Sequence, residues 1–107
     1  MARRVNRAEI WLYEFKPPDK RRPVVVLSRP EVIPLLHTVM VAPITSAIRG
    51  APSEVRVGAD EGLKHESAVN LDHVQTVSKA RLGGVITTLG ATRMSAVRSA
   101  LLFALGF

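Results

Sequence analysis

Three features are missing from this 107-residue sequence: cysteine, long apolar runs and an apolar leader. Without cysteine, neither disulfide bonds nor thiolate metal sites can form. No apolar run approaches the length of a membrane span, and residues 1–7 lack the apolar core of a signal peptide. We therefore expect a single cytoplasmic domain without membrane segments, large enough for one hydrophobic core.

Acidic residues are scarce in the first part of the chain. The whole sequence has 15 Lys and Arg, nine Asp and Glu, and a net charge of +6. Residues 1–29 hold eight Lys and Arg against three Asp and Glu, so five of the six excess positive charges lie there. Such a concentrated field suits a polyanion, either a nucleic acid or an acidic protein segment. The alternative is a solvated basic face that only aids solubility.

The three histidines do not have the spacing of metal ligands. We therefore expect no metal and no cofactor. His37 and His65 fall in expected loops without a partner in the sequence, so we interpret them as structural or solvated.

The apolar pattern predicts short strands followed by one helix. Alternation over residues 8–15 predicts a first strand that places Trp11, Tyr13 and Phe15 on one partly covered side. Further strands are predicted at 22–28, 38–45, 54–57, 67–71, 74–78 and 85–89, with Gly83-Gly84 as a break before the last.

A change of period marks the end of the chain. Apolar residues recur at three- and four-residue spacing from Met94 to Leu105, which predicts an amphipathic helix over residues 91–105. Gly90 is its expected N-cap and Gly106 its expected end. The combination indicates a mainly β fold, a small antiparallel barrel with a helix docked on it.

Two of the predicted strands carry a polar group at one end. Arg22 and Pro23 open the first, while Thr45 and Ser46 close the second. If the two strands pair antiparallel, Arg22 and Thr45 meet at one rim of the sheet. A guanidinium beside a hydroxyl can bind a phosphate. The alternatives are a surface arginine and hydroxyls that cap the strand end.

Four segments, in this order along the chain, resemble the MazF/PemK/Kid family of toxin ribonucleases. Arg7-Ala8-Glu9-Ile10-Trp11 is similar to the family's R-G-E-hydrophobic-W start. Arg22 through Ser28 resembles its R-P-V-hydrophobic-V-hydrophobic-S strand, and Pro43 through Ser46 resembles its P-hydrophobic-T-S ending. Ser67 through Val77 resembles the later G-V-x-x-x-D-Q-hydrophobic-x-T-I strand pair.

The resemblance implies an SH3-like barrel and a sequence-selective, metal-independent endoribonuclease that cleaves single-stranded RNA through attack by the 2′-hydroxyl. It also implies a toxin of a type II toxin–antitoxin system, a homodimer with RNA in a groove at its interface, and an antitoxin whose acidic, disordered tail occupies the same groove. We predict Arg22 and Thr45 as catalytic residues. The predicted RNA-binding residues are Lys16, Lys20, Arg21, Ser46, Asp72, His73 and Gln75.

Several roles stay open at this point. Asp72 could orient Arg22, accept a proton or bind a base edge, or it could simply form a turn. His73 could act as a general acid or base, or make an ordinary polar contact. Ser28 is expected to bind local backbone. The first-strand aromatics could stack on bases, although alternate strand positions more often face a core or interface.

The chain departs from the family in the loop between the first two strands. Several members carry a histidine or glutamate there, proposed as a base or an RNA contact. Residues 16–21 offer only Asp19 for that role. The sequence therefore leaves the general base unassigned.

Two other functions are compatible with such a fold. The CcdB gyrase poisons share the barrel and act by binding protein, typically through a tryptophan near the C-terminus. This chain ends Phe103-Ala104-Leu105-Gly106-Phe107 without tryptophan, which argues against that reading. The other alternative is a barrel that binds nucleic acid without cutting it.

Overall fold

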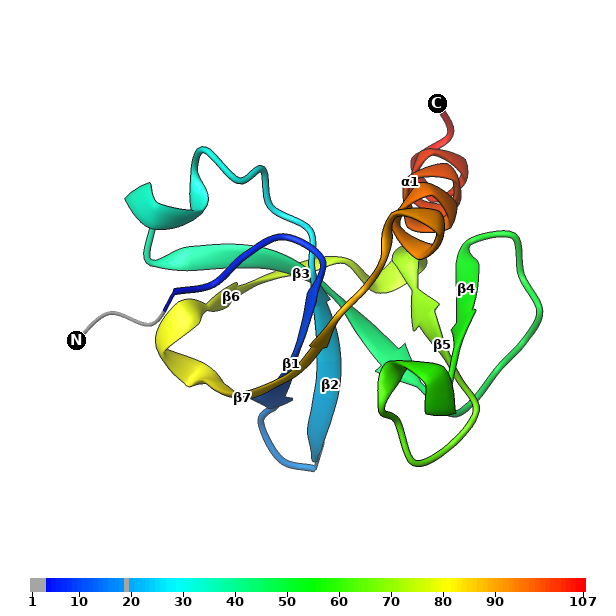
Figure 1. Cartoon of the computed structure of the whole chain (residues 1–107), viewed down its shortest axis with the longest axis horizontal. Coiled ribbons are helices and arrows are strands. Elements are labelled where there is room, and N and C mark those ends of the chain that lie inside the picture. The colour runs from blue at the N-terminus through cyan, green and yellow to red at the C-terminus, as the bar shows by residue number, and fades with distance from the viewer. Residues whose placement is uncertain (1–3, 19) are drawn as a thin grey trace.

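The computed structural model describes residues 4–18 and 20–107 (Figure 1). This part of the chain forms seven strands and one α-helix, connected by loops and short 3₁₀ turns. The strands and the helix are β1 (Glu9–Glu14), β2 (Arg21–Val26), β3 (Thr38–Thr45), β4 (Glu54–Val57), β5 (Ser67–Asn70), β6 (Gln75–Ser78), β7 (Leu82–Thr88) and α1 (Ala91–Leu105).

The strands pair antiparallel into one curved sheet, in the order β4-β5-β3-β2-β1-β7. The remaining strand, β6, pairs with the first half of β3, from Thr38 opposite Ser78 to Val41 opposite Gln75. Figure 1 shows α1 lying over one end of this sheet, beside β4 and β5. The predicted mainly β fold with a C-terminal helix is confirmed.

β3 changes neighbours halfway along its length. Val26, Val25 and Val24 of β2 lie opposite Val41, Ala42 and Pro43. On its other edge, β3 pairs first with β6 and then, at Ile44 and Thr45, with Val69 and Ala68 of β5. Pro23 and Pro43 lack the N–H that would extend a ladder, so prolines stand on both strands where β2 and β3 part. The ends of the two strands, Arg22 and Thr45, are left on either side of the opening.

The alternation along β2 divides the apolar residues between two cores. Val25 faces a cluster that includes Ile10, Leu71 and Val97, beneath α1. Val24 and Val26 face the opposite cluster, with Trp11 and Tyr13. All three valines are fully buried, so this strand is covered on both faces. Trp11 and Tyr13 are core residues and are not available to stack on bases.

α1 begins and ends where the sequence predicts. Gly90 is its N-cap, and Gly106 ends it in the left-handed conformation at φ 79°, with its N–H donating to the carbonyls of Leu102 and Phe103. Val97 and Ala100 of this helix are buried against the sheet. Leu105, which was expected on the buried face, is instead exposed. The last turn of the helix projects past the sheet, so it has no apolar surface to cover (Figure 1).

The prediction that Gly83-Gly84 breaks the chain is wrong. Both glycines lie inside β7, which begins at Leu82. A Cβ at position 83 would come within 3.3 Å of the Leu12 carbonyl oxygen on β1. Glycine here permits close approach of two strands and does not interrupt one.

Candidate functional site

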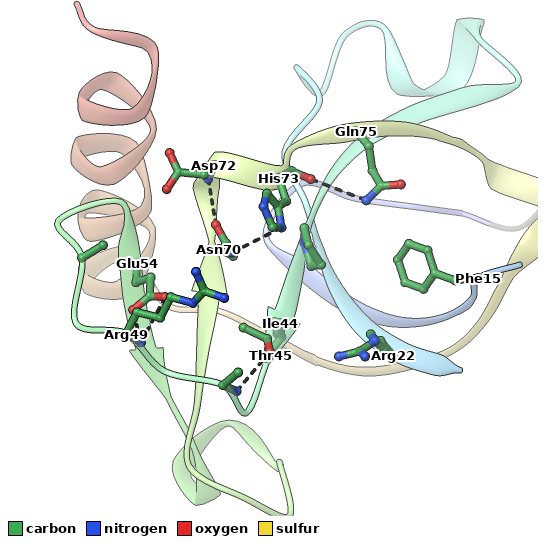
Figure 2. A pocket seen from close by; sticks show the side chains of 13 residues that line it. Phe15, Arg22, Ile44, Thr45, Arg49, Glu54, Asn70, Asp72, His73 and Gln75 are labelled. Carbon is green, nitrogen blue, oxygen red and sulfur yellow. Dashed lines mark hydrogen bonds between the residues drawn. The ribbon is translucent and has the colours of Figure 1, made fainter. Parts of the chain in front are cut away.

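A groove of about 450 Å³ opens where β2 and β3 diverge (Figure 2). Its walls come from the ends of β1, β2 and β3, the loop after β3, and the segment that joins β5 to β6. The lining residues are Phe15, Arg22, Pro43, Ile44, Thr45, Ala47, Arg49, Ala51, Glu54, Asn70, Asp72, His73 and Gln75.

Arg22 and Thr45 both line this groove, as their places on β2 and β3 predict. Arg22 pairs with Tyr13 in the β1–β2 ladder, and its exposed side chain makes no hydrogen bond or ion pair with the residues that the structure describes. The hydroxyl of Thr45 accepts the Ala47 N–H at 3.1 Å. A hydroxyl that accepts one bond can still donate its own proton. Thr45 therefore has the capping role considered for it. Its hydroxyl proton can still be donated to a ligand.

Asn70 fixes the orientation of His73. The Asn70 side-chain carbonyl accepts the Asp72 N–H at 2.9 Å, so its amide nitrogen is the atom that faces His73 Nδ1, at 3.4 Å. An amide nitrogen can only donate, so Nδ1 accepts and the proton of a neutral imidazole lies on Nε2. His73 therefore offers a hydrogen-bond donor to the groove.

Asp72 is held away from Arg22. Its carboxylate accepts a hydrogen bond from the Ser53 hydroxyl at 2.5 Å, and Figure 2 shows it turned away from Arg22 toward α1. Within the described residues the two form no ion pair, so the structure gives no support to the idea that Asp72 orients Arg22. The turn-forming alternative is observed, because Asp72 lies in the 3₁₀ turn Leu71–His73.

The other predicted residues fall in and around the groove. Gln75 lines it and donates to the His73 carbonyl at 3.5 Å. Lys16, Lys20 and Arg21 are exposed in and beside the β1–β2 loop, between the lining residues Phe15 and Arg22, but they do not line the groove themselves. Ser46 is exposed next to Thr45 and is also outside the lining. Asp19, the candidate acid of the loop, lies outside the described residues.

Sequence reasoning missed part of the wall that the loop after β3 provides. Arg49 and Glu54 line the groove, and the Glu54 carboxylate accepts the backbone N–H groups of Arg49 and Gly50. A glutamate that starts a strand four residues after a glycine was the available signal. Ser28 behaves as expected, because its hydroxyl accepts the Met40 N–H across the β2–β3 connection.

Two structural features bear on metals and membranes. In the described part of the chain, no group of three or more His, Asp or Glu side chains is arranged to hold a metal ion. None of the described helices combines the length and apolar character needed to cross a membrane.

Comparison with known proteins defines the class. Residues 6–105 match the family model described as PemK-like, MazF-like toxin of type II toxin–antitoxin system. The match spans nearly all of the chain, so this protein belongs to that toxin family. The family resemblance carried by the four sequence motifs is therefore confirmed.

Individual relatives come from Mycobacterium tuberculosis. A protein named "Probable endoribonuclease MazF5" is 46% identical over 97 residues, covering 89% of this chain and 87% of its own. "Endoribonuclease MazF3" is 43% identical over 83 residues, covering 78% and 81%. The solved structure of toxin MazF-mt6 superposes with a TM-score of 0.85 at 38% identity, over 92% of this chain and 97% of that one. The two sequence relatives are thus named as a probable endoribonuclease and an endoribonuclease, and the solved toxin shares the fold of this chain.

Proposed function

We propose that this protein is an endoribonuclease that cleaves single-stranded RNA without a metal ion, by attack of the 2′-hydroxyl on the adjacent phosphate. The observation that carries the proposal is the presence of Arg22 and Thr45 in one groove, at the diverging ends of β2 and β3. The MazF-like relatives named as endoribonucleases support it.

Arg22 supplies the positive charge that the reaction needs. In-line attack produces a dianionic phosphorane, and a guanidinium can donate two parallel hydrogen bonds to its oxygens. The Arg22 side chain is exposed at the groove and has no partner among the described residues. Its charge is therefore free to meet the phosphate, and we assign it electrostatic stabilisation of the transition state.

Thr45 and His73 supply hydrogen bonds. The Thr45 hydroxyl is held by the Ala47 N–H and donates its proton to a phosphate oxygen. His73 contacts Asn70 through Nδ1 and offers its Nε2–H to the RNA, which makes it a binding residue in this scheme. Gln75, Ser46 and Asp72 add further polar contacts to the RNA strand.

The rest of the substrate is matched by charge and by the half-buried ring of Phe15. Lys16, Lys20 and Arg21 line up beside the groove and meet further phosphates of the chain. Phe15 lines the groove itself, and a single-stranded base can stack on such a ring. Selectivity for an RNA sequence follows from these contacts to unstacked bases.

We further propose that the toxin works as a homodimer and is silenced by an antitoxin. An acidic, disordered antitoxin tail would bind the same basic groove as RNA, because both ligands are flexible and anionic. Solved relatives include a mycobacterial endoribonuclease described as bound to its cognate antitoxin, with a TM-score of 0.87. At 22% identity that structure supports the fold alone.

Cleavage of a defined RNA in EDTA tests the activity. We expect cutting to persist and to leave a 2′,3′-cyclic phosphate, and a single 2′-deoxy substitution at the cut nucleotide to abolish it. Activity that vanishes in EDTA and returns with Mg²⁺ or Mn²⁺ would refute the mechanism. RNA binding without cutting would indicate the non-catalytic barrel, and gyrase inhibition without RNA binding would indicate the CcdB-like alternative.

A further inference from the structure

The loop between β3 and β4 is pinned at both ends by side chains. At its start the Thr45 hydroxyl accepts the Ala47 N–H at 3.1 Å. At its far end the Glu54 carboxylate accepts the N–H of Arg49 at 3.1 Å and that of Gly50 at 2.8 Å. Gly50 adopts φ 76°, a left-handed conformation that glycine tolerates and residues with a side chain disfavour. The loop is therefore a shaped segment that places Arg49 at the edge of the groove.

The Arg49 guanidinium is left free by this arrangement. Glu54 is its acidic neighbour, but the recorded contacts of that carboxylate are to backbone N–H groups, and the described residues contain no ion pair with Arg49. Figure 2 shows the Arg49 side chain reaching from its loop toward the centre of the groove, on the opposite side of Thr45 from Arg22. Two guanidinium groups thus flank one hydroxyl.

The aromatic rings of the groove are not shared evenly between its two ends. Phe15 stands at the Arg22 end (Figure 2), with its ring packed edge-on against Tyr13 at 4.8 Å. The loop that carries Arg49 contributes Ala47 and Ala51 to the lining. An aromatic ring is a common stacking surface for an unstacked base, whereas a phosphate requires only a charged donor. The Arg49 end is therefore better suited to a phosphate than to a base, whereas the Arg22 end can hold a base against Phe15 beside the scissile phosphate.

We propose that Arg49 binds one of the two RNA phosphates that flank the scissile phosphate. Glu54 is the positioning residue that holds Arg49 in place. The inference rests on the proposed ribonuclease function and adds a second anionic subsite to it. RNA would lie along the groove with one phosphate at Arg22 and Thr45 and its neighbour at Arg49.

The test replaces single phosphates by uncharged methylphosphonates in a short RNA that carries one cleavage site. A 2′-O-methyl version of each RNA, which cannot be cut, gives binding constants by fluorescence anisotropy. For the wild-type protein we expect one flanking methylphosphonate to weaken binding about tenfold, the size of one charge-assisted hydrogen bond. The methylphosphonate on the other flank should have a much smaller effect.

Arg49→Gln should weaken binding of the unmodified RNA by the same factor and remove the penalty of that one methylphosphonate. Cleavage should show the change in KM, with kcat largely kept. Arg98→Gln is the matched control, because Arg98 is an exposed arginine of α1 outside the groove. It should leave both the affinity and the methylphosphonate penalty as in the wild type.

Glu54 variants test the positioning role. Glu54→Ala should raise KM and reduce the methylphosphonate penalty, whereas Glu54→Gln, which keeps an acceptor for the two N–H groups, should retain most of it. A Glu54→Ala protein with an unchanged penalty would remove Glu54 from the proposal.

The outcomes separate this inference from the ribonuclease itself. If RNA is cut in an Arg22-dependent way but Arg49→Gln leaves the methylphosphonate pattern unchanged, the subsite is wrong and the enzyme stands. If the loss of affinity in Arg49→Gln depends on which base lies next to the cleavage site, Arg49 recognises a base, and the phosphate assignment is wrong. A variant that loses only binding of an acidic antitoxin peptide would overturn it in favour of a protein contact. If no RNA is cut, the binding measurements still decide the role of Arg49.

Discussion

Arg22 is the residue on which the proposed chemistry depends most. Arg22→Ala should lower the single-turnover cleavage rate on the order of a hundredfold or more, as removal of one preorganised donor does in other enzymes. Arg22→Lys should restore little, because an ammonium lacks the planar fork. The side chain is exposed, so the thermal midpoint should stay unchanged in both variants.

Thr45→Val should reduce the rate in the same direction but by less, with Thr45→Ser as the control that keeps the hydroxyl. If Arg22→Ala cuts RNA at a near-normal rate, Arg22 is outside the site. If Thr45→Val does so, Thr45 is only the cap seen in its bond to Ala47.

Ala8 carries backbone strain that has no part in the proposed chemistry. It has φ 79°, while its N–H donates to the Val26 carbonyl and its own carbonyl accepts the Leu89 N–H. The family motif that this segment resembles has glycine here. We expect Ala8→Gly to raise the free energy of unfolding by about 1 kcal/mol, the cost of a left-handed conformation for a residue with a side chain. Urea denaturation measures it, and a less stable variant would show that the methyl group packs better than the backbone is strained.

At the residue scale, the sequence predicts what lies on strands better than what lies in loops. Arg22 and Thr45 follow from two apolar runs and an antiparallel register, so their meeting could be foreseen. Arg49 and Glu54 could not, because their position depends on how side chains bind the backbone of one loop. The partner of Asp72 is Ser53, 19 residues away, and no local pattern encodes that contact.

The two glycines of β7 provide a matched pair at the scale of the element. A Cβ on Gly83 meets the Leu12 carbonyl oxygen, whereas one on Gly84 has nothing within 4 Å. Gly84→Ala should stabilise the protein by roughly 0.5 kcal/mol, since alanine loses less entropy on folding. Gly83→Ala should gain nothing or lose stability, because β1 and β7 must move apart.

Denaturation of both variants in the same buffer decides the point. Equal stability of the two would mean that β1 and β7 do not approach as closely as the structure has them.

The elements themselves follow largely from periodicity and capping. The helix over residues 91–105 and the strands at 38–45 and 54–57 have the predicted bounds, because strong apolar patterns end at clear glycine or polar signals. The glycine pair misleads, since glycine serves equally as a turn and as a place for close packing. Leu105 also misleads, because periodicity does not indicate where the sheet beneath a helix stops.

The proposed homodimer concerns the whole molecule. Trp11 and Tyr13 of the first strand are buried, so they offer no apolar surface to a second subunit. Apolar surface remains instead at the end of α1, where Phe103 is 57% and Phe107 89% exposed, and at Leu35 and Leu36. We expect a dimeric mass by light scattering at micromolar concentration, since such surface favours association.

Phe103→Asp should shift the protein toward a monomer if the end of α1 forms the interface. Ser95→Asp, an exposed position earlier on the same helix, should leave the mass unchanged. A wild-type monomer under these conditions would count against the dimer and against a groove shared between subunits.

The pairing of β1 with β7 has a consequence for how the protein is made. Glu9 lies beside Thr88, so the strand that supports Arg22 gains its second neighbour only after most of the chain has been synthesised. Long-range pairing of this kind is completed late, because the connecting chain must exist before its ends can meet. On the ribosome, the support that β7 gives to β1 is therefore added near the end of translation. We expect a truncated chain that lacks β7 to hold β1 and β2, and with them Arg22, less firmly than the full-length protein does.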